Sequence, residues 1–366
     1  MGKIDELIKQ FWPNGVEVVE LGKIAKLVRG KVISKKYVLD NNGEYPVYSS
    51  QTSNNGEFGR INTYMFDGDY VTWTTDGAYA GTVFRRTGKF NITNICGLIK
   101  LEVSSINVGF LYYWLAITAK KYVNRATDNP KLMSNVVATI KVPLPPLAVQ
   151  KKIVEILDTF TGMIDNLQKE LEQRQKQFEY YRSKFFAYNE DECDWFSLPM
   201  ISENCDRKRK PIKGSKREKG IYPYYGASGI VDYVKDYILD GEYLLISEDG
   251  ANLVARNTPI AFSIEGKNWV NNHAHVVKFN SLNDQRFVEY YFNSIDLTPW
   301  ISGGAQPKLN QENLNKILIP YPSVERRNII VDTLKSFEAL ISNIKQEIEL
   351  RQKQYEYYRE KLLTFE

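Results

Sequence analysis

The sequence has no long apolar run and no recognisable targeting segment. No stretch approaches the roughly eighteen consecutive apolar residues that a transmembrane helix needs, so none is expected. The first residues lack the basic and then apolar pattern of a signal peptide. The three cysteines, Cys96, Cys193 and Cys205, are an odd number without CxxC spacing, which favours reduced thiols. We therefore expect a cytoplasmic protein without a membrane partner.

Motifs of catalysis and nucleotide binding are also lacking. There is no phosphate-binding GxxxxGK loop, no GxGxxG, no GxSxG and no HExxH. The only histidines, His273 and His275, would share one face of a strand, and packing explains them better than a metal site that needs further ligands. Glu248 and Asp249 are adjacent, so on a strand they would point to opposite faces and could not act as an acid–base pair. We predict no catalytic residue, no metal site and no cofactor bound by this chain itself.

What the sequence does contain is an internal duplication. RQKQFEYYR begins at Arg174 and RQKQYEYYR at Arg351, an offset of 351 − 174 = 177 residues. The same offset aligns the Pro-Lys-Leu phrase at 130–132 with the one at 307–309. Between Tyr48 and Asp67 the second copy is four residues shorter, and it regains them before Pro307. The 366 residues are enough for two or three domains, and the repeat indicates two copies of one unit.

Each copy combines a β-rich module with a long helix. Residues 17–142 (module 1) and 194–319 (module 2) are rich in β-branched and aromatic residues broken by Gly, Asn and Asp, which predicts short strands with turns. One helix is expected near 108–123 and its counterpart near 285–294. The proline-rich stretches VPLPP and IPYPS separate each module from its long helix, and Ser323 is a suitable N-cap for the second.

The two long helices show the sharpest periodicity of the chain. Apolar residues recur with 4-3 spacing for more than four heptads in each, with one arginine, Arg174 or Arg351, at a seam position. The order module–helix–module–helix predicts that the helices pair antiparallel, in a rod of about 48 Å, on the order of 14 base pairs of B-DNA. We predict that the two arginines fix the register of the pair. The alternative, that each helix packs only on its own module, fits such a sustained period less well.

These observations define the predicted fold class as α+β. It is a tandem repeat of a mixed α/β module followed by a long helix, with the two helices paired as an antiparallel coiled coil. The predicted boundaries are 1–145 for the first domain, 146–188 for the first helix, 189–322 for the second domain and 323–366 for the second helix.

Basic residues recur at the same place in both copies, within RGKVISKK and within DRKRKPIKGSKREKG. A basic run is usually a solvated face, but its recurrence favours contact with phosphates, although the net charge is only +4. The candidate phosphate-binding residues are Lys31, Lys35, Lys36, Lys208, Arg209, Lys210 and Lys213.

Polar loops occupy matching places in the two modules while their contents differ. Such a pattern is expected if each module reads a different short DNA sequence, because amide, hydroxyl and carboxylate groups pair with base edges. Ordinary loop drift would give the same pattern. The candidate base-reading residues are Ser49, Ser50, Gln51, Asn54, Asn55, Thr74, Thr75, Asp76 and Tyr79 in module 1, and Tyr225, Ser228, Ser247, Glu248, Asp249 and Asn252 in module 2.

Two phrases, DNPKLMSNVVATIKVPLPPLAVQKKIV and GGAQPKLNQENLNKILIPYPSVERRNII, together with the opening WPNGVEVVELGKIAKLVRGK, resemble the specificity subunits of type I restriction–modification enzymes. The resemblance covers essentially the whole chain. It implies that each module is a target-recognition domain that reads half of a split sequence in double-stranded DNA. It further implies that the helices fix the gap and dock two methyltransferase subunits, which bind S-adenosylmethionine. Restriction and translocation would belong to further subunits that use ATP and Mg.

Two other classes of protein remain open on the residues alone. One is a coiled-coil interaction or scaffold protein whose two β-rich modules bind a non-DNA ligand such as a peptide or a sugar. The other is a single-chain nuclease or methyltransferase, which would need a cofactor or metal motif. The repeated basic segments favour the specificity subunit over both.

Overall fold

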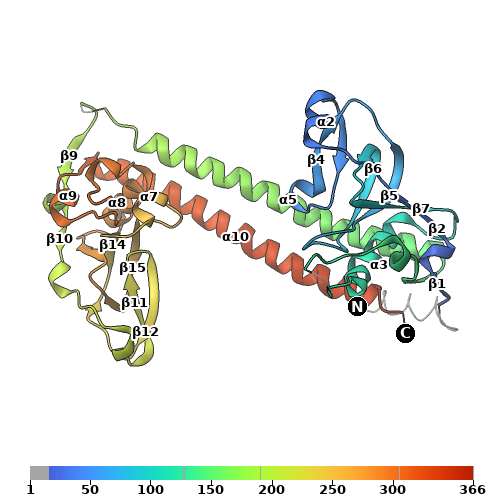
Figure 1. Cartoon of the computed structure of the whole chain (residues 1–366). Coiled ribbons are helices and arrows are strands. Elements are labelled where there is room, and N and C mark those ends of the chain that lie inside the picture. Colours follow the sequence, from blue (N-terminus) through green and yellow to red (C-terminus); the bar gives the residue numbers. More distant parts are fainter. Residues whose placement is uncertain (1–15, 127, 190, 305, 366) are drawn as a thin grey trace. The chain divides into compact units, whose positions relative to one another are not determined.

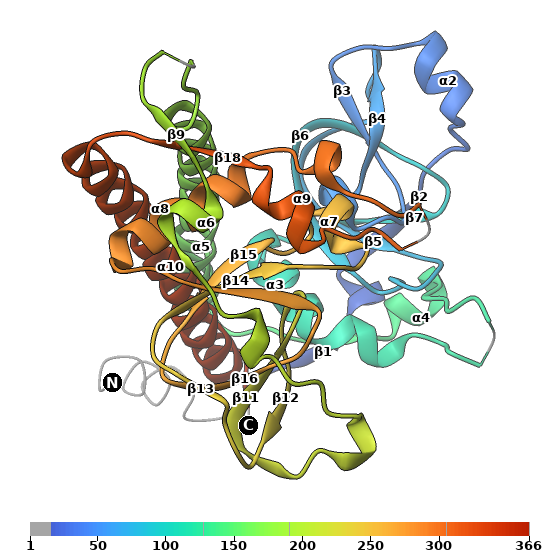
Figure 2. The ribbon, with the colours of Figure 1, turned by 90° about the vertical axis from the view of Figure 1, so that its left-hand side faces the viewer.

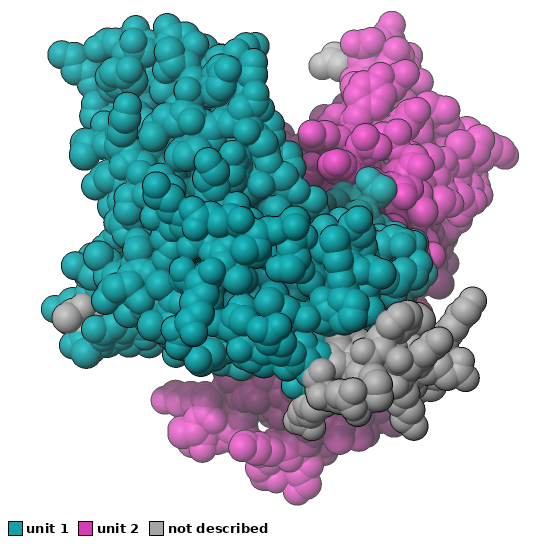
Figure 3. Space-filling model, turned by 90° about the vertical axis from the view of Figure 1, so that its right-hand side faces the viewer, with its two compact units in different colours: residues 1–166, 348–366 teal, residues 167–347 magenta. Residues whose placement is uncertain are grey.

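The computed structural model describes residues 16–126, 128–189, 191–304 and 306–365 (Figure 1). The beginning of the WPNG phrase and Ala305, which take part in the resemblance, lie outside these ranges. The chain forms two compact units, Met1–Asn166 with Ile348–Glu366, and Leu167–Glu347 (Figure 3). Each unit therefore contains one module, the first half of the helix that follows it and the end of the other long helix.

Module 1 is built on a six-stranded sheet with the order β2-β7-β5-β6-β3-β4 and a separate pair, β1-β8. The pairs β2–β7, β5–β7, β5–β6 and β3–β4 are antiparallel, whereas β3–β6 is parallel. Its strands are β1 Val18–Glu20, β2 Ala25–Arg29, β3 Tyr45–Tyr48, β4 Glu57–Ile61, β5 Phe66–Thr74, β6 Val83–Ile92, β7 Cys96–Leu101 and β8 Lys141–Pro143. Its helices are α2 Lys35–Asp40, α3 Val108–Thr118 and α4 Ser134–Ala138.

Module 2 repeats this plan with two four-stranded sheets, β10-β17-β14-β15 and β12-β11-β16-β13, and the pair β18-β9 (Figure 2). Its strands are β9 Asp194–Ser197, β10 Glu203–Asn204, β11 Lys219–Gly226, β12 Gly229–Val234, β13 Leu239–Asp240, β14 Tyr243–Ser247, β15 Ala261–Ile264, β16 Lys267–Val270, β17 Ala274–Lys278 and β18 Leu318–Tyr321. Its helices are α6 Leu198–Ile201, α7 Asn252–Ala255, α8 Leu282–Ser294 and α9 Gln311–Asn315. The helices predicted near 108–123 and 285–294 are thus confirmed as α3 and α8.

A glycine with positive φ lies at the same point of both modules, within a single strand in module 1 and between two strands in module 2. Strand β6 pairs with β5 on one side and with β3 on the other, and Gly88 within it has a φ of +77°. The registers of β5–β6 and β14–β15 place Gly266 at the same point of module 2, and there a φ of +68° separates β15 from β16. Positive φ is readily adopted by glycine, so both copies bend the chain at this point.

The two long helices are α5, Leu147–Phe185, and α10, Val324–Leu362. The prolines end each module just before its helix, and the Ser323 hydroxyl accepts a hydrogen bond from the Arg326 backbone N–H, which confirms the predicted N-cap. The seam residues of α10 are all buried or half-buried between Ile330 and Leu362, as the 4-3 spacing predicts. In unit 1, Ile153 and Leu157 of α5 pack in the same core as Leu362.

Ring pairs within each unit demonstrate the antiparallel pairing of the helices. In unit 1, Phe160 of α5 stacks on Tyr358 of α10, with centroids 5.3 Å apart and an interplanar angle of 21°. In unit 2, Phe337 of α10 stacks on Tyr181 of α5 at 5.5 Å and 25°. The offset of 177 converts the first pair into the second (160 + 177 = 337 and 181 + 177 = 358), so the duplication is preserved in the contacts themselves.

Candidate nucleic-acid interface

The two polar loops predicted to read DNA lie side by side in module 1. The first, residues 49–56, joins β3 to β4, and the second follows the end of β5. Together they line one surface hollow, formed by Ser49, Ser50, Gln51, Thr52, Ser53, Phe58, Ala78, Tyr79 and Ile95. Tyr79 is 58% exposed at its rim. Loops that are about 25 residues apart in the sequence are therefore brought to one surface by the β5–β6 and β3–β6 pairings.

The first loop ends in a turn of unusual backbone conformation. Asn54 and Asn55 have φ values of +48° and +51°, and Gly56 follows at +77°. Asparagine is among the few residues that occupy this region at modest cost. Both asparagines are exposed, and within the described ranges neither side-chain amide makes a hydrogen bond. Their placement is compatible with the predicted base readout.

Four of the predicted base-reading hydroxyls are instead structural. Ser49, Thr74, Thr75 and Ser247 are buried. Their hydroxyls are used inside the module: Thr93 donates to Ser49, Thr74 donates to the Tyr79 carbonyl, Thr75 to the Ile95 carbonyl, and Ser247 to the Ala227 carbonyl. These four hydroxyls hold the loops from inside the module, and base contact by them stays a prediction.

In both modules the loop after the central strand is joined to the Pro-Lys-Leu phrase by equivalent backbone hydrogen bonds. The Leu132 N–H donates to the Thr75 carbonyl at 2.8 Å, and the Leu309 N–H donates to the Glu248 carbonyl at 2.7 Å. The N–H groups of Gly77 and Gly250 donate to the carbonyls of Pro130 and Pro307, both at 3.0 Å. The repeated phrase is thus a brace for the candidate reading loop.

The side chains beneath this brace differ. In module 1 the Trp73 indole N–H donates to the Leu132 carbonyl at 3.0 Å. Trp73 pairs with Gly97, where an added Cβ would lie 2.2 Å from the indole ring. In module 2 the corresponding strand pair is Ile246 with His275, and the His275 Nε2 lies 2.8 Å from the Leu309 carbonyl.

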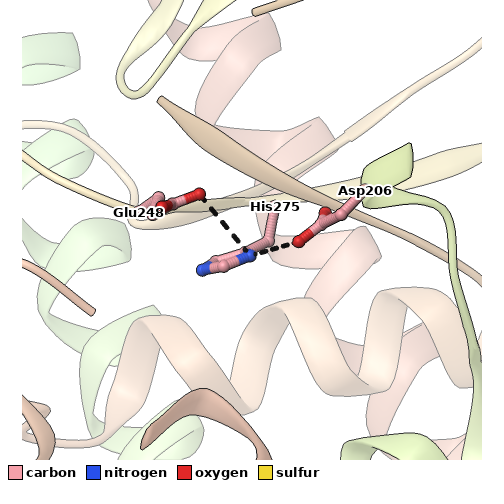
Figure 4. Close-up of side chains that lie close together, drawn as sticks. All are labelled: Asp206, Glu248 and His275. Atoms are coloured by element: carbon pink, nitrogen blue, oxygen red, sulfur yellow. Dashed lines mark hydrogen bonds and ion pairs between the residues drawn. The ribbon is translucent and has the colours of Figure 1, made fainter. Parts of the chain in front are cut away.

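His275 is the centre of a buried ion-pair cluster (Figure 4). Its Nδ1 lies 2.7 Å from the Asp206 carboxylate and 3.8 Å from that of Glu248. The Leu309 carbonyl can only accept, so the hydrogen of that contact is on Nε2. Arg209 bonds to Asp206 at 3.1 Å and to Glu248 at 2.5 Å, and Lys308 reaches Glu248 at 3.2 Å.

The cluster has the ligand types of a metal site, because oxygen and nitrogen atoms of Asp206, Glu248 and His275 lie within 4.8 Å of one another. The guanidinium of Arg209 already bridges the two carboxylates, and a second cation would be repelled by it. Burial raises the pKa of both carboxyls. The bonds from His275, Arg209 and Lys308 outweigh that effect and leave each pKa below its ordinary value. We interpret the cluster as structural.

Two further candidate DNA-binding residues belong to this cluster. Glu248 was expected to read a base and Arg209 to bind phosphate, but both are engaged in the buried cluster. Asp249 is bonded to His273 at 2.8 Å, and the Asn252 amide makes two hydrogen bonds of 3.0 Å to the backbone of Thr258. Their polar groups hold this loop in place.

The remaining candidates are accessible. Ser228 is exposed at the tip of the β11–β12 hairpin, while Tyr225 is half-buried with its ring 5.9 Å from that of Phe262. Ser50, Gln51 and Asp76 are half-buried; the first two donate to the carbonyls of Ile95 and Glu57, and Asp76 forms an ion pair with Arg29 at 3.9 Å. Among the predicted phosphate-binding residues, those that are exposed are Lys31, Lys35 and Lys36 in module 1 and Lys208, Lys210 and Lys213 in module 2.

Sequence reasoning missed Arg86, which is 3% exposed in β6. Its guanidinium lies between the rings of Tyr48 and Phe84, at 3.6 Å and 4.3 Å from their centroids, and donates to the Asn55 carbonyl at 2.7 Å. Burial lowers its pKa. Nothing in the stretch VFRRTGKF distinguishes this arginine from its neighbour, so only the fold reveals it.

Comparison with known proteins agrees with this geometry. A profile of the type I restriction modification DNA specificity domain matches residues 13–174 and 196–350, once for each copy. A Mycoplasma pneumoniae relative named as a type I specificity subunit is 31% identical over 364 residues, 96% of this chain and 98% of that protein. The specificity subunit of the type I restriction enzyme MpnII, from the same species, is 41% identical over 180 residues, 48% of this chain and 54% of that protein.

Two solved structures share the fold. The S subunit of a type I restriction–modification system from M. genitalium has a TM-score of 0.69 at 15% identity, over 96% of this chain and 98% of that one. A chain from a structure of type I system assembly and conformational transition has a TM-score of 0.56 at 14% identity, with the same coverage.

The chain belongs to the type I restriction–modification DNA specificity family. It is a DNA-recognition subunit with two specificity domains, and the alternative of a scaffold for a non-DNA ligand is not supported. None of the helices in the described ranges is long and apolar enough to cross a membrane.

Proposed function

We propose that each module reads one half of a bipartite target in double-stranded DNA. The observation that carries this proposal is the convergence of two polar loops on one surface of module 1, with exposed lysines in both modules. In module 1 these are the Asn54–Asn55 turn and Tyr79, with Lys31, Lys35 and Lys36 in the same unit. Lysines neutralise phosphates without sequence preference, whereas amide groups discriminate bases.

We further propose that the paired helices set the distance between the two half-sites. The equivalent ring pairs Phe160–Tyr358 and Phe337–Tyr181 support a regular antiparallel pair. Seam residues Arg174 and Arg351 each donate to a glutamine three positions later, Gln177 and Gln354, at 3.0 Å and 2.9 Å. Their role in fixing the register is part of this proposal. Replacing both with leucine should stabilise the pair and loosen the gap; greater stability with an unchanged gap would remove that role.

Catalysis is assigned in this proposal to partner subunits. Two methyltransferase subunits would bind S-adenosylmethionine, and restriction subunits would use ATP and Mg. Tyr180 and Tyr357 support a docking surface on the helices. They are related by the 177-residue offset, and they are 59% and 48% exposed. Large exposed aromatic side chains at equivalent points of a duplicated rod fit two copies of one partner.

Methylome sequencing of a host that carries the chain with its modification subunits tests the proposal. We expect a bipartite motif with a fixed gap. Inserting one heptad into each helix at positions 177 residues apart should lengthen the gap and leave both half-sites unchanged. A continuous motif would contradict the spacing role, and methyl transfer to DNA by the purified chain alone would contradict the assignment of catalysis to partners.

A further inference from the structure

The turn Asn54–Asn55 carries two groups that face solvent and that nothing in the fold requires. Both residues have left-handed backbone conformations, both are exposed, and neither amide is bonded within the described ranges. An asparagine amide offers a donor and an acceptor in the geometry that matches N7 and N6 of adenine in the major groove. A backbone held in an unfavourable region is typical of a functional element that the surroundings support.

Arg86 is the support. Its side chain donates to the Asn55 carbonyl and packs against Gly56, where an added Cβ would lie 2.9 Å from its Nη2. No carboxylate in the described ranges forms an ion pair with it, and its Nε is buried without a partner. A buried guanidinium with one carbonyl acceptor and two aromatic faces is costly to desolvate, so stability alone does not explain an arginine at this position.

Module 2 supplies the comparison that gives this reason. The strand registers leave eight residues between Tyr48 and Glu57 (57 − 48 − 1) but four between Tyr225 and Ile230 (230 − 225 − 1). Phe84 pairs with Thr72 in module 1, and Phe262 pairs with Leu245 in module 2, so the two phenylalanines are equivalent. Two residues further along the strand, Ile264 of module 2 occupies the position of Arg86. The rings of Tyr225 and Phe262 then meet directly at 5.9 Å. The arginine thus occurs in the module with the longer loop, inserted between the two rings.

We propose that the Asn54–Asn55 turn is the adenine-reading element of module 1 and that Arg86 is the positioning residue that holds it. This inference rests on the proposed function. The four-residue insertion provides the turn, and the stacked guanidinium fixes its carbonyl side so that the amides project outward. The β11–β12 connection has no such turn, and module 2 reads its half-site with that shorter tip.

The base-reading part is tested with the full chain in complex with its modification subunits, by methylome sequencing and by binding to DNA libraries. For Asn54→Ala and Asn55→Ala we expect at least one to reduce discrimination for adenine at one position of half-site 1 by about 5- to 150-fold. Half-site 2 in the same molecules is the internal control. Asn42→Ala, an exposed asparagine in the same module, is the matched control and should leave both half-sites unchanged.

The positioning part is tested with Arg86→Met and Arg86→Lys. Arg86→Met should relax half-site 1 alone, with a smaller loss for Arg86→Lys, which keeps the charge but loses the planar stack. Hydrogen exchange on the full chain should show faster exchange of amides 50–57, with β5 and β7 unchanged. Unchanged exchange of that loop would overturn the role of Arg86. If Arg86→Met prevents folding, hydrogen exchange of Arg86→Lys still tests the positioning role, and the asparagine variants still test the reading role.

The outcomes separate this inference from the proposed function. A wild-type complex without a bipartite preference would contradict the proposed function itself. A bipartite wild type whose asparagine variants keep every base preference in half-site 1 would overturn the reading role alone. Equal loss at both half-sites in the Arg86 variants would overturn the positioning role.

Discussion

In module 1 the Leu132 carbonyl accepts a hydrogen bond from the indole of Trp73, whereas in module 2 the Leu309 carbonyl accepts one from the imidazole of His275. The two donors come from different strands of equivalent pairs. Trp73 lies on β5 and pairs with Gly97 of β7, whereas His275 lies on β17 and pairs with Ile246 of β14. The side chain that donates to the leucine carbonyl is thus on a different strand in each module, and the hydrogen bond itself is present in both. The duplicated modules therefore preserve the backbone brace while the buried chemistry beneath it diverges.

A second contrast lies where each module meets its own helix. Tyr113 donates to Asp158 at 2.7 Å, with Arg85 of β6 at 3.4 Å from the same carboxylate. In module 2 the equivalent Tyr290 donates to Glu338 at 2.7 Å, with Arg286 of α8 at 2.8 Å. Only the tyrosine keeps its sequence position. The 177-residue offset places the counterpart of Asp158 at position 335 (158 + 177), whereas the acid that bonds to Tyr290 is Glu338. A hydrogen bond from a buried tyrosine to a helix carboxylate is thus the shared element.

The largest expected difference between the modules comes from Asp206→Ala. It removes one of the two carboxylates that pair with both His275 and Arg209 and leaves Glu248 alone with them, at a cost of about 3–5 kcal/mol. The counterpart in sequence position is Arg29, whose ion pair with Asp76 is long at 3.9 Å and partly exposed, so Arg29→Ala should cost about 0–1 kcal/mol. Hydrogen exchange of β14 and β17 against β5 and β7 measures both. Similar losses would contradict the structural role of the cluster.

The exchange of donors is tested next by Gly97→His. The new side chain would overlap the Trp73 ring and destabilise module 1 by about 1–3 kcal/mol. Adding Trp73→Ile recreates the arrangement of module 2 and should recover a part of this loss. A double variant no more stable than the single one would show that the two solutions are not interchangeable. Denaturant unfolding of the full chain, followed by local exchange, provides the comparison.

The tyrosine contact should have a smaller effect that is similar in both units. Tyr113→Phe and Tyr290→Phe each remove one hydrogen bond to a carboxylate that keeps its arginine partner, at a cost of about 1 kcal/mol. Burial and the adjacent carboxylate raise the pKa of both phenols, so they remain donors at neutral pH. If one variant were neutral and the other costly, the shared role would be lost.

The smallest contrast is expected in acid. Asp206 and Glu248 have lower pKa values in the folded chain than their ordinary 3.8 and 4.5, so the unfolded chain binds protons more readily. Their stabilisation is present above those ordinary values and is lost as pH falls through the folded values. The equivalent positions of module 1, Arg29 and Thr75, carry no carboxylate. Strands β14 and β17 should therefore lose protection at a higher pH than β5 and β7, and the reverse order would contradict this assignment.

The sequence by itself determined the repeat, the fold class and the helix seams. These features follow from periodicity and from turn residues, which are local properties that a linear pattern records. Seam burial in α10 and the N-cap at Ser323 both agree with these predictions.

Only the tertiary structure decided which polar residues are free to contact DNA. Thr74, Thr75 and Ser247 look like readers in a polar loop but bond to backbone carbonyls, and Glu248 is neutralised by Arg209 across 39 positions of the chain. Arg86 shows the converse, because its partners Tyr48 and Asn55 come from other segments. Whether a polar group faces solvent depends on what other segments offer it. That information arises from strand pairing and not from residue type.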